Sequence, residues 1–393
     1  MRGFFHTSLS SHQANIPTVP RCGACGLYRH CRSPKMPPYG KGKRSVLVVG
    51  EAPGETEDEK GRPFVGTSGQ LLRTQLYEIG VDLDEDTWVT NSVICRPVRN
   101  ATPTPDQILY CYPNLNNVLK KLRPKVVITL GRSALQSVLL PYWQDIGNLE
   151  RWIGWQIPLP DFWLCPTYHP AYLLRANHPV LDRAVLDHLR SAFELVDRPR
   201  PQVDTGSIVC TFDEAKIEQT IREIVEEGGW VAVDYETNCL KPETPGGRIF
   251  SCAISNGKHT ISFLWTPRTQ AATAEVLFSK RCWKIASNLK MEERWTRHVF
   301  GRGVVRWGWD TMLAAHVLDN RQGICSLKFQ ALVRLGVPTY NQQVEAFLTG
   351  NGRSRLNRIT EIEPRTLLRY GGMDALLEWH LAKLQRQEMG YGD

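Results

Sequence analysis

The sequence predicts an α/β protein made of two domains. Its 393 residues exceed the usual size of a single domain. In the first half, short apolar runs alternate with helical stretches, which is typical of a parallel sheet covered by helices on both faces. The second half opens with a helix, a strand and a hairpin. A Pro-rich polar stretch over residues 198–208 lies between the halves and is typical of a linker.

The first predicted domain spans residues 21–197. Short apolar runs predict its strands, and the segments between them predict helices. The strands are Val46–Val49, Trp88–Ile94, Lys125–Leu130 and Trp163–Thr167, and the helices are Gly69–Ile79, Asp106–Leu122, Gly131–Leu140 and Leu181–Leu195.

The second predicted domain spans residues 209–393. An amphipathic helix is expected to precede a buried strand, and a hairpin follows them. The dipeptide Asn256-Gly257 in that hairpin favours a type I′ turn. Beyond Phe278 the chain reads mostly as helix. The elements are the helix Asp213–Glu227, the strand Trp230–Glu236 and the hairpin strands Arg248–Ser255 and His259–Trp265.

Positive charge is concentrated at the start of the chain. The net charge is +8, and residues 1–50 contain eight Lys or Arg but no Asp or Glu. We expect residues 1–20 to form a disordered basic arm. A basic block favours a polyanionic partner, with nucleic acid first, and the alternative is a solvated arm with no partner. No apolar run is long enough to span a membrane and no signal peptide is evident, which predicts a cytoplasmic protein without a membrane partner.

Four cysteines have a spacing that suits a metal centre. Eleven cysteines in a cytosolic chain do not indicate a disulfide framework. Cys22 and Cys25 form a C-x-x-C loop that Cys95 and Cys111 could complete with two further thiolates. Zinc and an iron–sulfur cluster both remain open on this spacing, and Cys31 lies close enough to replace one ligand. The alternative is a group of buried cysteines that bind no metal.

A Gly/Pro turn follows the strand Val46–Val49 at the sheet edge where open α/β folds bind ligands. Glu51 offers a polar edge there and Phe64 an aromatic face. Asn91 and His169 follow two other predicted strands, so we expect them at the same edge. The alternative is that this Gly/Pro turn is an ordinary connection between a strand and a helix, and the predicted positions of Asn91 and His169 argue against it.

These segments resemble the iron–sulfur (family 4) uracil-DNA glycosylases. The resemblance extends from about Cys22 to Leu195 and implies a three-layer α/β/α glycosylase fold. It also implies a [4Fe–4S] cluster on the four cysteines, a flipped uracil stacked on Phe64, and an Asn91 side chain that reads its Watson–Crick edge. The matching segments are Gly50–Gly54 with Glu57-Asp58, Gly61–Gly66, Thr90-Asn91 before Cys95–Pro97, and His169–Leu174.

The expected reaction is hydrolysis of an N-glycosidic bond. A neutral His169 and the backbone N–H groups of Gly50–Gly54 would stabilise negative charge on the departing base. Either Glu51 or Glu57 could stabilise the cationic sugar or position water, and we favour Glu51. Base extrusion favours single-stranded or mismatched DNA, and Arg175 could hold phosphate or fill the vacated stack. The remaining residues expected to bind substrate are Gly50, Ala52, Glu57 and Phe64.

A second set of acidic residues suits a pair of divalent cations. Asp234 and Glu236 are two residues apart on one strand, so their side chains share a face. Tyr370 and Asp374 share a helical face at i and i+4. Together with Glu292, these carboxylates could hold two Mg²⁺ ions that clamp a phosphodiester. Surface acids placed by chance are the alternative.

This ordered set resembles the DEDDy 3′–5′ exonucleases, the proofreading module of A-family DNA polymerases. The resemblance implies an RNase H-like mixed-sheet fold with Mg²⁺ or Mn²⁺ bound by Asp234, Glu236, Glu292 and Asp374. It further implies that Asp234 bridges both metal ions and that Tyr370 orients the attacking water. Glu292 departs from the usual Asp, so a decayed module that only holds DNA is the alternative.

The sequence as a whole predicts a bifunctional DNA-processing enzyme of repair or replication. It would excise uracil from single- or double-stranded DNA and degrade DNA from 3′ ends. The alternative is a non-catalytic DNA-binding accessory subunit. The chain stops nineteen residues after Asp374 with no polymerase domain, which suggests either service to a separately encoded DNA polymerase or independent action in repair, in a prokaryotic cell or in one infected by a virus or phage.

Overall fold

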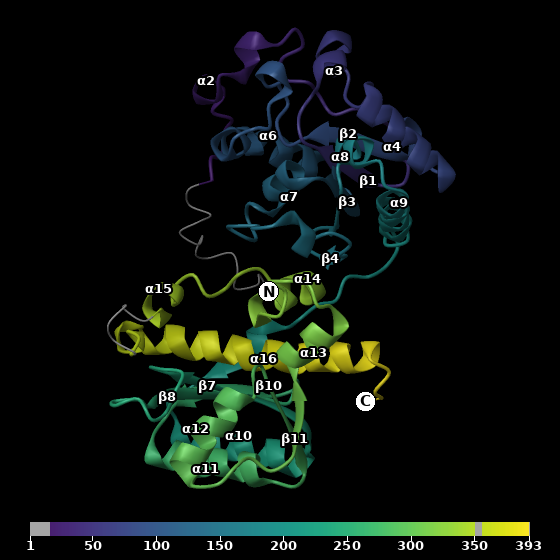
Figure 1. Cartoon of the computed structure of the whole chain (residues 1–393). Helices are drawn as coiled ribbons and strands as arrows, with labels where there is room; N and C mark the ends of the chain where they lie inside the picture. Colours follow the sequence, from purple (N-terminus) through teal and green to yellow (C-terminus); the bar gives the residue numbers. More distant parts are fainter. Residues whose placement is uncertain (1–15, 350–355, 393) are drawn as a thin grey trace. The chain divides into compact units, whose positions relative to one another are not determined.

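The computed structural model describes residues 16–349 and 356–392, and these form two compact units (Figure 1). The N-terminal unit contains residues 16–201 together with Leu332–Pro338. The C-terminal unit contains the other described residues. Most of the expected basic arm, up to residue 15, lies outside the described part of the chain.

The N-terminal unit is built on a five-stranded sheet in the order β2-β1-β3-β5-β4. All neighbouring pairs are parallel except β4 with β5. β1, β3 and β5 are buried along their whole length, which explains why their sequences are nearly continuous apolar runs. The strands are β1 (Val46–Gly50), β2 (Thr87–Asn91), β3 (Val126–Leu130), β4 (Ile157–Pro158) and β5 (Trp163–Thr167).

Helices cover both faces of this sheet. Side chains of α4 and α9 pack with those of β1, β3 and β5 in one core, and α7 packs with α6 on the opposite face (Figure 1). The helices are α2 (Cys22–Cys25), α3 (Glu55–Lys60), α4 (Thr67–Glu78), α5 (Leu83–Asp86), α6 (Pro105–Leu122), α7 (Arg132–Leu139), α8 (Pro170–Ala176) and α9 (Pro179–Phe193), with 3₁₀ turns at Leu27–His30, Val98–Asn100 and Leu149–Arg151.

The C-terminal unit is built on a six-stranded mixed sheet in the order β11-β10-β7-β8-β9-β6. β7, β10 and β11 are parallel to one another, whereas β8 runs antiparallel to both β7 and β9. The strands are β6 (Ile208–Cys210), β7 (Gly229–Thr237), β8 (Ile249–Ser255), β9 (Thr260–Leu264), β10 (Cys282–Ala286) and β11 (Trp307–Asp310).

The long helix α16 lies across one face of the mixed sheet, and α10, α11 and α12 lie on the other (Figure 1). α16 begins with Pro at its first position, where a missing N–H leaves no hydrogen bond unmade. The helices from residue 202 onward are α10 (Glu214–Glu227), α11 (Pro267–Phe278), α12 (Lys290–Phe300), α13 (Thr311–Leu318), α14 (Leu327–Leu335), α15 (Glu345–Leu348) and α16 (Pro364–Glu388), with 3₁₀ turns at Thr205–Ser207 and Ile359–Glu361.

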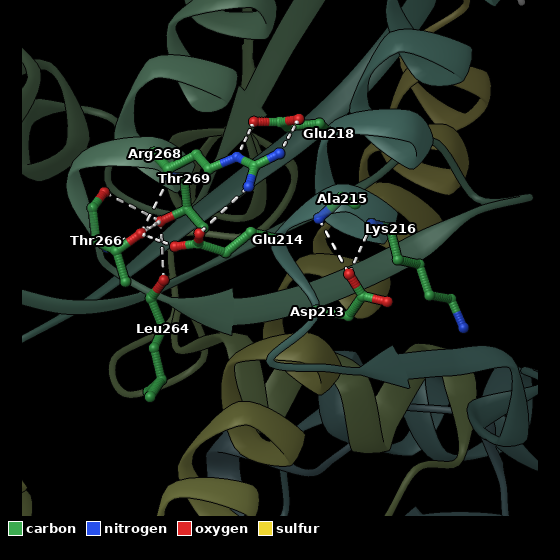
Figure 2. A network of polar contacts seen from close by, with 9 residues as sticks. All are labelled: Asp213, Glu214, Ala215, Lys216, Glu218, Leu264, Thr266, Arg268 and Thr269. Atoms are coloured by element: carbon green, nitrogen blue, oxygen red, sulfur yellow. Dashed lines mark hydrogen bonds and ion pairs between the residues drawn. The ribbon is translucent and has the colours of Figure 1, made fainter.

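Polar contacts join the first turns of α10 and α11 (Figure 2). The Arg268 guanidinium donates to both carboxylate oxygens of Glu218, at 2.5 and 2.9 Å. Thr266 caps α11 and also donates its hydroxyl to Glu214 at 2.7 Å. Asp213 accepts the N–H groups of Ala215 and Lys216 and so caps α10. These bonds fix the two helices side by side beneath the sheet.

The sequence expectation for the turn between β8 and β9 differs from the structure. The hairpin β8–β9 forms, but the expected type I′ turn is wrong because Gly257 has a positive φ and Asn256 does not. The Asn256 side chain accepts the N–H groups of Lys258 and His259, which moves the turn on by one residue. Beyond Phe278 the chain is mostly helical, and the strands β10 and β11 lie between the helices. Among the described residues, no helix is both long and apolar enough to cross a bilayer.

Candidate active sites

Four loops meet at the carboxyl edge of the parallel sheet in the N-terminal unit. Gly50 and Asn91 are paired in register at the ends of β1 and β2. A Cβ atom added at Gly50 would lie 2.5 Å from Asn91 Oδ1 and 2.6 Å from Phe64 Cζ, so the three residues are in contact. Only glycine fits at this position, because any side chain would displace the amide and the ring.

The Phe64 ring is aimed at Gly50 by an uncommon backbone conformation. Phe64 has φ +54° and is buried. Glu57 holds this conformation, because its carboxylate accepts the N–H groups of Val65 and Gly66 at 3.1 and 2.7 Å. The same carboxylate accepts the Gly54 N–H at 3.1 Å. Glu57 therefore ties the two loops together through three backbone bonds, which fits a positioning role rather than direct contact with substrate.

Glu51 lies beside the loop that follows β3. Its carboxylate accepts a hydrogen bond of 2.8 Å from the Ser133 hydroxyl on α7. Its backbone carbonyl accepts from the Ser92 hydroxyl at 2.6 Å and from the Val93 N–H. These bonds fix Glu51 between the ends of β1, β2 and β3, while Ala52 follows it in the same loop. Ser133 was not expected from the sequence, although Gly131-Arg132-Ser133 follows a predicted strand at this same edge.

His169 caps α8 and is partly buried. Its Nδ1 atom accepts the Ala171 N–H at 3.1 Å. Burial, and then the nearby cation of Arg175, lower the pKa of His169 to about 4 against a smaller opposing effect of Glu57. The ring is therefore neutral at physiological pH, with its hydrogen on Nε2. Arg175 itself lies exposed in the last turn of α8.

The four expected metal-binding cysteines line one small cavity. Cys22 and Cys25 come from α2, Cys95 from the loop after β2, and Cys111 from α6. The Lys35 N–H donates to the Cys95 thiol at 3.2 Å. Burial raises the pKa of the Cys95 thiol to about 12. A thiolate at this position is therefore unfavourable unless a nearby positive charge, such as a metal ion, neutralises it. Cys31 does not line the cavity, but it lies beside Cys95, whose pKa it helps to raise, and its thiol donates to the Leu27 carbonyl at 3.1 Å.

A second site lies in the C-terminal unit. Each of Asp234, Glu236 and Asp374 offers a carboxylate oxygen, and these atoms lie within 4.8 Å of one another. Burial, followed by the Asp374 charge, raises the pKa of Asp234 to about 8, and burial with the Asp234 and Asp374 charges raises that of Glu236. Such repulsion among buried acids is relieved when a cation binds. The three carboxylates therefore fit a metal-dependent enzyme.

The segment between β10 and α12 brings a further carboxylate toward this cluster. The Asp310 carboxylate accepts the N–H groups of Asn288 and Leu289 and caps α13, so it fixes the start of α12. Glu292 on α12 is buried, and its Oε2 atom has no hydrogen-bond partner. Burial, and then the Asp234 charge, raise the pKa of Glu292.

Three residues of this site were not expected from the sequence. Lys328 donates to Asp374 Oδ2 at 2.5 Å and to the Tyr370 hydroxyl at 2.8 Å. Tyr340 donates its hydroxyl to Asp374 Oδ1. Glu378 lies one turn after Asp374 on α16 and accepts the Ser287 N–H at 3.1 Å. Glu378 could have been predicted, because Tyr370, Asp374 and Glu378 have the i, i+4, i+8 spacing of residues on one helical face.

The comparisons with known proteins assign a family to each half of the chain. The uracil DNA glycosylase superfamily matches residues 37–191. A family described as 3′–5′ exonuclease matches residues 208–388. The expected fold classes are confirmed in outline, since the first region forms a three-layer α/β/α unit on a mostly parallel sheet and the second an α/β unit on a mixed sheet.

Several curated proteins are similar to this chain. The type-4 uracil-DNA glycosylase of Saccharolobus solfataricus is 39% identical over 173 residues, which are 43% of this chain and 78% of that protein. That of Thermotoga maritima is 35% identical over 184 residues, which are 46% of this chain and 92% of that protein. A DNA polymerase of Bacillus phage SP01 is 31% identical over 101 residues, which are 26% of this chain and 11% of that protein.

Among solved structures, Escherichia coli RNase D matches with a TM-score of 0.34 and 14% identity, over 47% of this chain and 44% of that one. The matched relatives and the two family regions support a bifunctional hydrolase that removes uracil from DNA and carries a 3′–5′ exonuclease domain. The chain belongs to the type-4 uracil-DNA glycosylase family, with a 3′–5′ exonuclease domain after the glycosylase domain.

Proposed function

We propose that the glycosylase site works through Gly50, Phe64, Asn91 and His169. The observation that carries this proposal is the contact of Gly50 with both Phe64 and Asn91, three residues far apart in sequence. Phe64 would stack on a flipped uracil, and the Asn91 amide would hydrogen-bond its Watson–Crick edge. Arg175, exposed on α8, would hold a DNA phosphate or fill the stack that the base leaves.

The same proposal gives His169 and Glu51 separate roles. With Nδ1 accepting the Ala171 N–H, the neutral ring can donate only from Nε2, toward a base oxygen that becomes negative as the glycosidic bond breaks. Glu51, held by Ser133, would stabilise the cationic sugar or orient the water that attacks it. Ala52 and its neighbours would contribute backbone to the base pocket, and Glu57 would preserve its shape.

We propose that Cys22, Cys25, Cys95 and Cys111 hold a [4Fe–4S] cluster of structural role. A single zinc ion with Zn–S bonds of ~2.3 Å would place the thiols ~3.8 Å apart. In the described residues, no three of these thiols lie within 4.8 Å of one another, although all four line one cavity. The wider spacing favours a polynuclear cluster, and four thiolates are the ligands that such a cluster takes.

We propose that the second site hydrolyses DNA from the 3′ end with Mg²⁺ or Mn²⁺. Asp234, Glu236 and Asp374 would be ligands, with Asp234 shared by both ions, and Glu292 would contribute directly or through water. Two divalent cations in such a cage stabilise the attacking and leaving oxygens of a phosphodiester. The buried Glu292 carboxylate, with its Oε2 free of partners, supports an active rather than a decayed module. Tyr370 would orient the attacking water.

Two assays on the purified full chain test these activities. Release of uracil from a labelled oligonucleotide tests the first, and shortening of a 3′ end in Mg²⁺ or Mn²⁺ tests the second. Asp234→Asn should abolish shortening and leave uracil release unchanged. Binding of the oligonucleotides without either product would instead favour an accessory DNA-binding subunit.

We also propose domain boundaries of 21–197 and 209–393, joined by the linker 198–208, and service to a separately encoded DNA polymerase. The similarity of part of the chain to a phage DNA polymerase motivates the latter. Purification from the native host would test it, since failure of any polymerase to co-purify would count against this partner.

A further inference from the structure

A single ammonium group lies inside the acidic cluster of the C-terminal unit. The Lys328 side chain is only 19% exposed, and it touches both a proposed metal ligand and the proposed water-orienting tyrosine. Its Nζ atom lies 4.6 Å from the centre of the Tyr370 ring and 5.4 Å from that of Tyr340. The two rings and Asp374 therefore confine the ammonium to one position.

Both carboxylate oxygens of Asp374 already accept hydrogen bonds in this arrangement. Oδ1 accepts from Tyr340 and Oδ2 from Lys328. Other oxygens of the cluster remain without hydrogen-bond partners although they are buried, namely Asp234 Oδ2, Glu292 Oε2 and Glu378 Oε2. Lys328 thus offsets part of the negative charge at Asp374, while these other oxygens remain available to divalent cations.

The contact with Tyr370 has a chemical consequence. A lysine ammonium can only donate hydrogen bonds, so the Tyr370 oxygen is the acceptor of the 2.8 Å bond. The phenolic hydrogen must then point toward another acceptor, and without metal ions the Asp374 carboxylate is a hydrogen-bond partner of this phenol. Lys328 in this way selects the direction in which Tyr370 donates.

We propose that Lys328 is a positioning residue of the exonuclease reaction. It holds the Tyr370 oxygen beside Asp374 so that the phenol donates toward the attacking water or the scissile phosphate. Because its positive charge lies beside a metal ligand, it also competes with divalent cations for the cluster. This inference rests on the proposed exonuclease function, and it predicts opposite effects of Lys328 on turnover and on metal affinity.

Substitution of Lys328 separates this role from simple support of the fold. Lys328→Met keeps the length of the side chain and removes its charge, and Lys328→Arg keeps the charge. Lys383→Met is the matched control, since Lys383 is exposed on α16, the helix that carries Asp374. For each full-length variant, Mn²⁺ binding without DNA is followed by electron paramagnetic resonance, and kcat and KM by shortening of a labelled 3′ end.

We expect Lys328→Met to lower kcat by about tenfold or more with little change in KM, because the phenol is no longer oriented. We expect the same variant to bind Mn²⁺ about tenfold more tightly, because a neighbouring positive charge is gone. Lys328→Arg should return both values toward those of the wild type, and Lys383→Met should change neither.

An unchanged kcat in Lys328→Met would overturn the positioning role. A parallel loss of kcat and Mn²⁺ affinity would also overturn it, because that is the effect of a damaged fold. A wild-type protein that binds Mn²⁺ but shortens no 3′ end would defeat the proposed exonuclease itself. In that case the Mn²⁺ titration alone still decides whether Lys328 competes with the metal ion.

Discussion

The Nδ1 atom of His169 accepts a hydrogen bond from the backbone N–H of Ala171 at 3.1 Å. This bond joins the cap of α8 to the side chain on which the glycosylase proposal depends. It fixes the ring orientation and leaves Nε2 as the donor of the neutral imidazole. One local contact of the helix therefore determines both where the ring lies and which atom can reach a substrate.

His169→Ala should reduce uracil release by at least about a hundredfold, because a donor to the departing base is lost. His178→Ala is a matched control. His178 caps α9 through the same kind of bond, from the Val180 N–H to its Nδ1 atom at 3.3 Å, but it is exposed. A rate measured on a uracil-containing oligonucleotide should fall only in the first variant. Equal losses in both would show that the cap, rather than the donor, matters.

The low pKa of His169 predicts a specific pH profile. Burial lowers this pKa to about 4, so the ring stays neutral from pH 8 down to about 5. His169→Gln provides an amide donor that does not titrate. The ratio of wild-type to variant excision rates should be constant over this interval and change only as the pH approaches 4. A ratio that rises as the pH falls from 8 to 6 would instead indicate a protonated imidazole as the active form.

Much of the fold followed from the sequence because its signals were local. The strands of the parallel sheet are buried apolar runs, and each is present within a few residues of its expected bounds. The two-residue strand β4 was missed because it is too short to show a period. The turn at Gly257 was assigned the wrong type because the Asn256 side chain, which no dipeptide rule includes, takes two backbone N–H groups.

Gly50→Ala should impair uracil release with modest loss of stability. The added methyl group would lie 2.5 Å from Asn91 Oδ1 and 2.6 Å from the Phe64 ring, so the amide and the ring must separate. We expect a fall of about tenfold or more in excision, and overpacking of this kind costs roughly 1–3 kcal/mol. Excision rate and melting temperature together check this. Unimpaired excision would mean that the contact does not shape the substrate pocket.

If the four cysteines that line the cavity hold an iron–sulfur cluster, the protein should be coloured. The colour should depend on these four thiols and not on the thiol of Cys31. Cys111→Ser should remove visible absorbance, iron and acid-labile sulfide, and should lower the melting temperature because cluster binding stabilises the fold. Cys31→Ser is the control, since Cys31 lies outside the residues that line the cavity. Stoichiometric zinc in a colourless wild-type protein would refute the iron–sulfur assignment.

The acidic site could be predicted only in part. Asp234, Glu236, Tyr370 and Asp374 stood out because strand and helix periodicity placed each pair on one face. Lys328 and Tyr340 did not stand out, since Lys328 lies at the start of α14 and Tyr340 in the loop beyond that helix, and no spacing relates either residue to Asp374. Their contacts with Asp374 arise from tertiary packing, which spacing along the chain does not encode.

Removal of divalent cations should make the stability of the C-terminal unit fall as the pH rises. Burial and the Asp374 charge raise the pKa of Asp234 to about 8, well above the value of 3.8 for an unperturbed Asp. Between these values the folded state binds more protons than the unfolded state, so the free energy of unfolding decreases with increasing pH. In EDTA, the melting temperature of the unit should fall by a few °C between pH 6 and pH 8.5.

Two comparisons isolate the cause of that change. Saturating Mg²⁺ should restore the melting temperature most at pH 8.5, because a bound cation neutralises the carboxylates. Asp234→Asn removes one of the repelling charges and should weaken the pH dependence in EDTA. A melting temperature in EDTA that rises between pH 6 and pH 8.5 would contradict the raised pKa of Asp234. It would also contradict the inference that repulsion among these carboxylates favours cation binding.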